Sequence, residues 1–221
     1  MRKDVVILHR LNGKPVAEKF WAEPSDEFER ADDGYYSVRD AAWKFLIDQK
    51  IEYLPLDLFE IFERMGCLCI GFSSARETIE PIIGSEYFGE GVDCFTIFDG
   101  DKTVVVYNES LPQERLNYSL AHELGHIVLR HDQNTPFRYD AEADMFAARI
   151  LMPTAVLKAC KVTSAEEIAQ ICDVSMAAAR KRWDRMKTLN DRQRYLSSPL
   201  EKQVLAQFAD FIRDHNEHFH K

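Results

Sequence analysis

The sequence predicts a mixed α+β domain, in which a small and mostly antiparallel sheet packs on helices, followed by a helical extension. Two β-rich runs, residues 94–98 and 103–108, flank Asp99-Gly100-Asp101-Lys102, a segment typical of a hairpin turn. An apolar stripe with helical spacing follows over residues 111–129. Helical patterns recur within residues 163–183 and over residues 199–212, so residues 156–221 are predicted to form a helical extension.

Ahead of the hairpin, the chain alternates between polar segments and short apolar ones. Residues 5–8 favour a short strand, and the acidic run over residues 23–34 is typical of an exposed arm. Apolar residues recur at helical spacing over residues 37–49 and again over residues 54–66. The short apolar run over residues 67–72 then predicts a buried strand.

The composition is that of an ordinary globular protein, with 46% hydrophobic residues in a chain of 221. No run of about 18 apolar residues occurs, so we expect no signal peptide or membrane span and therefore a cytoplasmic protein. Five cysteines, an odd number, fit reduced thiols in that compartment. The net charge of −9 argues against a general nucleic-acid binder.

The segment His122-Glu123-Leu124-Gly125-His126 lies within the predicted helix that follows the hairpin. Two histidines four residues apart project from one face of a helix, and this spacing suits two imidazole ligands of a tetrahedral zinc ion. The Glu123 carboxylate can take a proton from a water molecule whose pKa the zinc lowers to about 7. The pattern therefore indicates a metallohydrolase. Candidate donors to a developing oxyanion lie nearby in the sequence: Tyr107, Tyr118, His131, Tyr139 and Arg149.

A third zinc ligand is expected on the next predicted helix, where the candidates are Asp140, Glu142 and Asp144. On a helix, Asp140 and Asp144 share a face, whereas Glu142 points about 160° away from them. Apolar residues flank both faces, so periodicity does not choose between the two sets. A metzincin site, with a third histidine six residues after the second one, is disfavoured because Asp132 occupies that position.

Three blocks of the sequence together resemble the ImmA/IrrE family of metallopeptidases: residues 106–108, 118–127 and 142–153. The family pattern is a Phe-Thr-x-Ala-His-Glu-x-x-His helix followed by a Glu-Ala-Asn-x-Phe-Ala-x-x-Leu-Leu-Met-Pro helix. The resemblance covers roughly residues 53–190, and the two-helix pattern is more specific than the five-residue motif alone. The sequence departs from the family's frequent Arg, Phe and Asn at three positions: Asn117, Tyr118 and Asp144.

The resemblance implies a zincin-like, gluzincin-type peptidase in which Zn²⁺ is held by His122, His126 and Glu142, with Glu123 as the catalytic base. The implied protein is a cytoplasmic zinc endopeptidase. Its implied partner is a substrate, a helix-turn-helix transcriptional repressor, as in mobile-element and stress-response systems where cleavage relieves repression. Two alternatives stay open: a DNA- or partner-binding regulator with a non-catalytic metal site, and an interaction protein that acts without proteolysis.

Residues 163–183 resemble a helix-turn-helix, because Ser164 and Glu167 form a capping-box pattern ahead of two short helical runs. Residues 180–194 contain seven basic and two acidic side chains, which suits contacts to phosphate. Residues 176–179, however, offer no side chain that reads a base edge through two hydrogen bonds. We therefore favour a packed helical appendage over a DNA reader.

The predicted organisation has three parts. Residues 1–35 form an arm and strand, residues 36–155 form a metallopeptidase domain, and residues 156–221 form the helical extension. One amphipathic helix is predicted over residues 199–212, and a polar, disordered tail that includes His215 is expected after it.

Overall fold

The computed structural model describes residues 5–7, 33–99, 101–131, 136–191 and 198–219. The described residues divide into two compact units. One contains residues 5–7 and 57–144, and the other contains residues 33–56 and the chain from Met145 on. Most of the expected N-terminal arm lies outside the described residues. The three-part division into arm, peptidase domain and extension stays a prediction.

The first unit holds the sheet and the helix that carries the histidine motif. Its elements are β1 (Val5–Ile7), α3 (Leu58–Arg64), β2 (Leu68–Gly71), α4 (Phe72–Thr78), α5 (Glu80–Ile83), the 3-10 helix η1 (Ser85–Phe88), β3 (Cys94–Asp99), β4 (Lys102–Tyr107) and α6 (Gln113–Leu129). The next helix, α7 (Pro136–Leu151), begins in this unit and its residues from Met145 on belong to the second. The predicted hairpin and motif-bearing helix are confirmed.

The sheet has four strands in the order β1-β3-β4-β2. β3 and β4 form the hairpin and pair antiparallel, with Asp99 opposite Lys102. β1 pairs antiparallel with β3, whereas β2 pairs parallel with β4. The parallel pair needs a long crossover, and the chain between its strands passes through α4, α5, η1 and β3. This small, mostly antiparallel sheet among helices agrees with the predicted α+β class.

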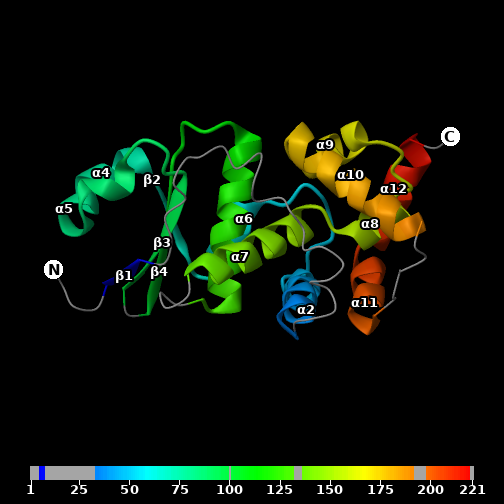
Figure 1. The fold of residues 1–221 in the computed structure, drawn as a ribbon, viewed down its shortest axis with the longest axis horizontal. Coiled ribbons are helices and arrows are strands. Elements are labelled where there is room, and N and C mark those ends of the chain that lie inside the picture. Colours follow the sequence, from blue (N-terminus) through cyan, green and yellow to red (C-terminus); the bar gives the residue numbers. More distant parts are fainter. Residues whose placement is uncertain (1–4, 8–32, 100, 132–135, 192–197, 220–221) are drawn as a thin grey trace. The chain divides into compact units, whose positions relative to one another are not determined.

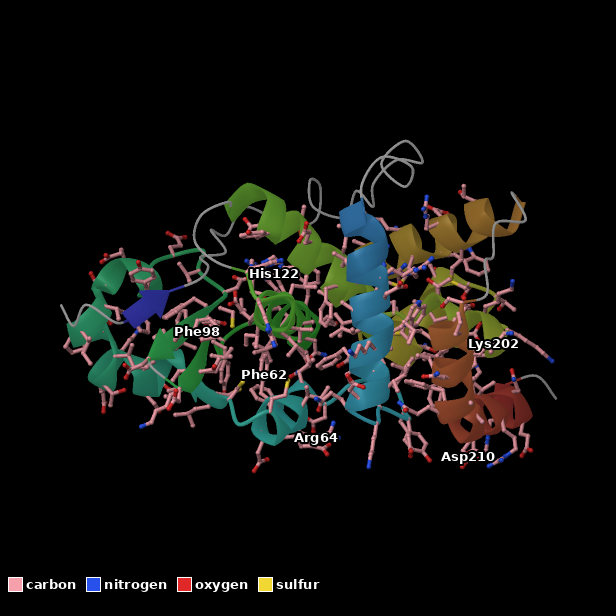
Figure 2. The ribbon with its side chains drawn as sticks, turned by 90° about the horizontal axis from the view of Figure 1, so that it is seen from below. Phe62, Arg64, Phe98, His122, Lys202 and Asp210 are labelled. Atoms are coloured by element: carbon pink, nitrogen blue, oxygen red, sulfur yellow. The ribbon has the colours of Figure 1, made fainter. Side chains whose placement is uncertain are left out.

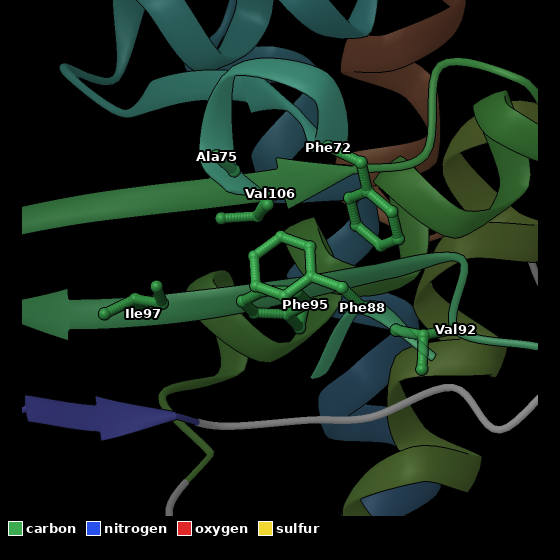
Figure 3. Packing of buried hydrophobic residues seen from close by; sticks show 7 residues of the cluster. All are labelled: Phe72, Ala75, Phe88, Val92, Phe95, Ile97 and Val106. Atoms are coloured by element: carbon green, nitrogen blue, oxygen red, sulfur yellow. The ribbon is translucent and has the colours of Figure 1, made fainter. Parts of the chain in front are cut away.

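The two sides of the sheet differ in chemistry. In Figure 1 the sheet lies between α4 and α5 on one side and α6 on the other. Alternate side chains of a strand point to opposite sides. On the side of α4, Phe95 and Ile97 join a buried cluster without polar members (Figure 3), whose residues are Phe72, Ala75, Phe88, Val92, Phe95, Ile97 and Val106. Thr96, between them in the sequence, points toward α6.

Helix α6 is held against the sheet by its apolar stripe and by one ion pair. Leu116, Leu120 and Leu124 are all buried, as their spacing predicted. In the first turn, the guanidinium of Arg115 donates to both carboxylate oxygens of Asp93, at 2.6 and 2.7 Å, and Asp93 directly precedes β3. The start of the motif helix is therefore fixed to the start of the strand beside it.

The second unit is helical. Its elements are α2 (Asp33–Asp48), the rest of α7, α8 (Thr154–Ala159), α9 (Ala165–Cys172), α10 (Met176–Asp191), α11 (Pro199–Gln207) and α12 (Ala209–Phe219). The single helix predicted over residues 199–212 is wrong, because the chain breaks at Phe208 into α11 and α12. The expected disordered tail is also wrong at His215, which lies buried in α12 and contacts Glu167 at 3.1 Å.

The predicted helix pair after residue 163 is present as α9 and α10. Ser164 caps α9 by accepting from the Glu167 amide at 3.1 Å. In α10 the guanidinium of Arg182 is buried and donates to the Ala148 carbonyl at 2.7 Å, so this basic residue serves internal packing. DNA binding by the pair stays untested.

Among the described residues, no helix has both the length and the apolar character that crossing a bilayer requires.

Candidate metal centre

The two motif histidines lie side by side on α6 and are both buried, with His122 1% exposed and His126 2% exposed. Figure 2 labels His122, which lies on the side of α6 toward the start of α7. The Nε2 atoms of the two rings are 3.0 Å apart. Two nitrogen ligands of a tetrahedral zinc ion lie about 3.3 Å from each other, given Zn–N bonds of about 2.0–2.1 Å. The pair therefore fits a shared zinc ion.

Asp140, in the first half of α7, completes a group of three. Its Oδ1 is 3.6 Å from His126 Nε2, and the ligand atoms of His122, His126 and Asp140 all lie within 4.8 Å of one another. Two imidazoles and one carboxylate are common zinc ligands, and three protein ligands leave a coordination position for water or substrate. The donor set therefore fits the metal expected from the motif.

The structure does not bring Glu142 to the histidine pair. Its Oε2 instead contacts His131 Nε2 at 3.1 Å. The helical geometry gives the reason: two residues along α7 correspond to about 160° of rotation, so only one of the two acidic sets can turn toward His122 and His126. The set that does so is Asp140 with Asp144. The Asp140 carboxylate, rather than that of Glu142, therefore lies with the two histidines in the group that could hold a metal ion, and the role of Glu142 as third ligand stays a prediction.

Asp144 contacts the ring nitrogen of His122 that faces away from His126. Its Oδ1 lies 2.7 Å from His122 Nδ1 and also accepts a hydrogen bond from the Tyr118 hydroxyl. A carboxylate on the second ring nitrogen fixes the tautomer and orientation of a metal-binding histidine. Burial lowers the pKa of His122, but the hydrogen bond and charge of Asp144, with the charges of Glu123 and Asp140, raise it above its ordinary value. The surrounding carboxylates thus favour positive charge at His122.

Glu123, the expected base, is fully buried and tied to the sheet. Thr96 Oγ1 donates to Glu123 Oε2 at 2.6 Å, across a sequence separation of 27 residues. Thr96 is itself fully buried in β3. Sequence reasoning missed Thr96, although it is a polar residue flanked by apolar residues in a buried strand. A buried hydroxyl needs a partner, and that requirement was the available signal.

Gly125 lies where α6 and α7 approach most closely. A Cβ atom at this position would lie 2.9 Å from the Ala143 Cα atom. A glycine inside a helix costs about 1 kcal/mol relative to alanine, and this close contact gives the reason for a glycine at position 125. The absence of a side chain lets the start of α7 come near enough for its carboxylates to reach the histidines.

The residues proposed as oxyanion donors serve other contacts in the structure. Tyr118 bonds Asp144, and Tyr107 packs its ring on Phe59. His131 lies between His126 and Glu142, and the Tyr139 ring stacks on it. Arg149 is assigned to the second unit and donates to the Met145 carbonyl. These contacts do not identify an oxyanion donor among the five.

Comparison with known proteins finds a similar family and a similar phage protein. Residues 88–184 match the family model Peptidase_M78, described as the IrrE N-terminal-like domain. "Uncharacterized immunity region protein 2" of Bacillus phage phi105 is 33% identical over 79 residues. That match covers 31% of this chain and 50% of the phage protein, so it spans about half the length of this curated relative. The matched segment contains α6, α7 and the histidine pair, and its similarity to the IrrE N-terminal-like domain agrees with the ImmA/IrrE resemblance of the sequence.

Proposed function

We propose that the protein is a zinc-dependent endopeptidase. The observation that carries this proposal is the buried cluster of His122, His126 and Asp140 next to Glu123, a carboxylate held by the sheet. The family match supports a metallopeptidase. A buried glutamate beside a possible metal site, bonded to a buried threonine, suits catalysis better than fold stability, because burying a carboxylate costs free energy.

We propose Asp140 as the third zinc ligand in place of Glu142. Its carboxylate lies with the two Nε2 atoms, and Asp144, one turn further along α7, contacts the back of His122. One face of α7 thereby supplies the ligand Asp140 and also Asp144, which orients the ligand His122. Glu142, on the opposite face, has a different partner in His131.

The chemistry follows from the residues present. A zinc ion bound here would acidify a water molecule and polarise the substrate carbonyl. Glu123 accepts the proton of the attacking water as its oxygen bonds to the carbonyl carbon. The carboxylate then delivers this proton to the leaving amine nitrogen as the C–N bond breaks. Thr96 holds Glu123 Oε2, so the carboxylate keeps one orientation through both transfers.

We further propose that the substrate is a helix-turn-helix transcriptional repressor and that cleavage takes place in the cytoplasm, where such a repressor acts. The family resemblance of the sequence implies this substrate class. The name of the phage relative describes it as an immunity region protein, which is compatible with a repressor nearby.

Co-expression with a candidate helix-turn-helix repressor tests the catalytic proposal. Wild type should cleave the repressor, whereas Glu123→Gln should bind one zinc ion per chain and leave the repressor intact. Glu114→Gln is the matched control, because Glu114 is exposed on the same helix, and it should cleave as wild type does. Equal cleavage by Glu123→Gln and wild type would refute the assigned base. A wild-type protein purified without a tag that holds no stoichiometric zinc would refute the proposed function.

Two isosteric variants test the choice of third ligand. Asp140→Asn removes a ligand, so its zinc content should fall well below one ion per chain. Glu142→Gln leaves the three ligands in place, so it should lose far less of its zinc than Asp140→Asn does. Metal analysis after gel filtration measures both, and the reverse pattern would restore Glu142 as the ligand.

A further inference from the structure

A line of buried contacts continues outward from His126, on the side away from His122. His126 Nδ1 lies 3.0 Å from His131 Nδ1, and His131 Nε2 lies 3.1 Å from Glu142 Oε2. The His131 side chain is 3% exposed and that of Glu142 is 17% exposed. The His131 ring also stacks on Tyr139, with centroids 4.4 Å apart and planes 7° apart. These contacts hold the His131 ring in one orientation.

The end of α6 explains why His131 can reach back to His126. Arg130 caps the helix in the left-handed conformation, with φ 55°, and the His131 amide donates to the His126 carbonyl at 3.0 Å. The chain therefore turns over the last turn of the helix. This turn places the His131 imidazole against the ring nitrogen of His126 that faces away from the metal cluster.

The positions of the protons follow from the contacts. A histidine that binds metal through Nε2 carries its proton on Nδ1, so His126 donates to His131 Nδ1. His131 then needs an acceptor nitrogen toward His126 and an N–H toward Glu142. A neutral imidazole has one acceptor nitrogen and one N–H donor, so neutral His131 meets both needs. The Glu142 carboxylate accepts the hydrogen bond from its Nε2. One assignment of protons thus satisfies both contacts.

We propose that His131 and Glu142 form an outer relay that fixes the tautomer and ring orientation of His126 for metal binding. The inference rests on the proposed metal site. His122 receives the same support directly from Asp144. Glu142 lies on the other face of α7, and His131 bridges the gap between it and His126. Both relay residues are positioning residues, and neither is a metal ligand.

The effect of the relay residues on His126 can be measured as zinc affinity, and this measurement needs no substrate. Loss of an outer partner of a metal-binding histidine weakens metal affinity by about 10–100-fold. We expect a loss of this size for His131→Ala and for Glu142→Gln, measured by competition with a chromophoric chelator. Because Glu142 acts through His131, adding Glu142→Gln to His131→Ala should cause little further loss. His131→Gln, whose amide oxygen can accept from His126, should recover part of the affinity and also serves if the alanine variant does not fold.

Tyr139→Phe is the matched control, since it keeps the stacked ring and should leave zinc affinity unchanged. Two-dimensional ¹H–¹⁵N NMR of the zinc-loaded protein gives an independent readout. It should show the proton of His126 on Nδ1 and that of His131 on Nε2. A structural role alone would not fix this tautomer pair.

The outcomes separate this inference from the proposed function. If wild type binds zinc and Asp140→Asn does not, yet His131→Ala and Glu142→Gln bind zinc as tightly as wild type, the relay is refuted and the metal site stands. Additive losses in the double variant would likewise refute action of Glu142 through His131. A wild-type protein that binds no zinc would refute the proposed function itself.

Discussion

The two sides of strand β3 have different roles in the first unit. Phe95 and Ile97 face α4 and pack into a cluster without a polar member, whereas Thr96 faces α6 and bonds Glu123. The apolar side requires only complementary shape, because its contacts are not directional. The polar side requires particular partners at particular atoms, because each buried polar group that loses its bond costs free energy. Stability and chemistry are thus assigned to opposite sides of one strand.

The largest expected effect on stability is on the apolar side. Phe95 is fully buried and its ring contacts those of Phe72, Tyr87 and Phe88. Phe95→Ala should lower the free energy of unfolding by about 3–5 kcal/mol, since it removes buried area and leaves a cavity. Urea denaturation measures this loss. Phe98→Ala, at a half-buried position of the same strand, is the control and should cost clearly less. Phe98 points to the opposite side of β3 from Phe95, so equal losses would mean that burial in the apolar cluster does not set the cost of the substitution.

A smaller loss of stability, with a large loss of activity, is expected on the polar side. Thr96→Val keeps the shape of the side chain but removes the donor to Glu123, which should cost about 1–3 kcal/mol. Repressor cleavage should fall more steeply than stability, because the carboxylate loses its fixed orientation. Thr96→Ser keeps the hydroxyl and should restore most of the cleavage rate. A Thr96→Val protein that cleaves as fast as wild type would show that this bond serves the fold alone.

The smallest expected effect on stability lies at the contact between α6 and α7. Gly125→Ala gains helix propensity of about 1 kcal/mol but places a methyl group against the Ala143 backbone, which costs about 1–3 kcal/mol. We expect a net loss near 1 kcal/mol in chemical denaturation. Zinc affinity should fall as well, because the added methyl group pushes α7 outward and moves Asp140 away from the histidines.

Gly71→Ala is the matched control for this contact. The atoms nearest to a Cβ atom at Gly71 belong to the Glu109 carboxylate, at 3.1 Å, so this substitution does not touch the contact between α6 and α7. Zinc affinity should stay at the wild-type value in this variant. A Gly125→Ala protein with unchanged zinc affinity would mean that the close approach of the helices does not set the site.

The sequence was sufficient for the hairpin, for the motif helix and for the convergence of the two histidines, but not for the break between α11 and α12. Periodicity and turn chemistry predicted the hairpin and α6, and the four-residue spacing predicted that His122 and His126 converge. The two alternative acidic sets were also correctly separated by helical geometry. The choice between them depends on how α7 is rotated about its axis, and the packing of Ala143 on Gly125 sets that rotation. Because apolar residues flank both faces of α7, the sequence does not show which face turns toward α6.

Other contacts escaped prediction because they join residues that are distant along the chain. Thr96 and Glu123 are 27 residues apart, and His215 and Glu167 are 48 apart. No local pattern encodes such pairs. The second pair explains why the chain at His215 is helical and buried, although its composition alone is typical of a polar tail.

Diffraction from crystals of the zinc-loaded protein, measured on both sides of the zinc absorption edge, tests the central claim most directly. We predict one anomalous peak within about 2.0–2.2 Å of His122 Nε2, His126 Nε2 and a carboxylate oxygen of Asp140, with Glu142 still bonded to His131. A zinc ion bound by Glu142 in place of Asp140, or no peak at the histidine pair, would contradict the account.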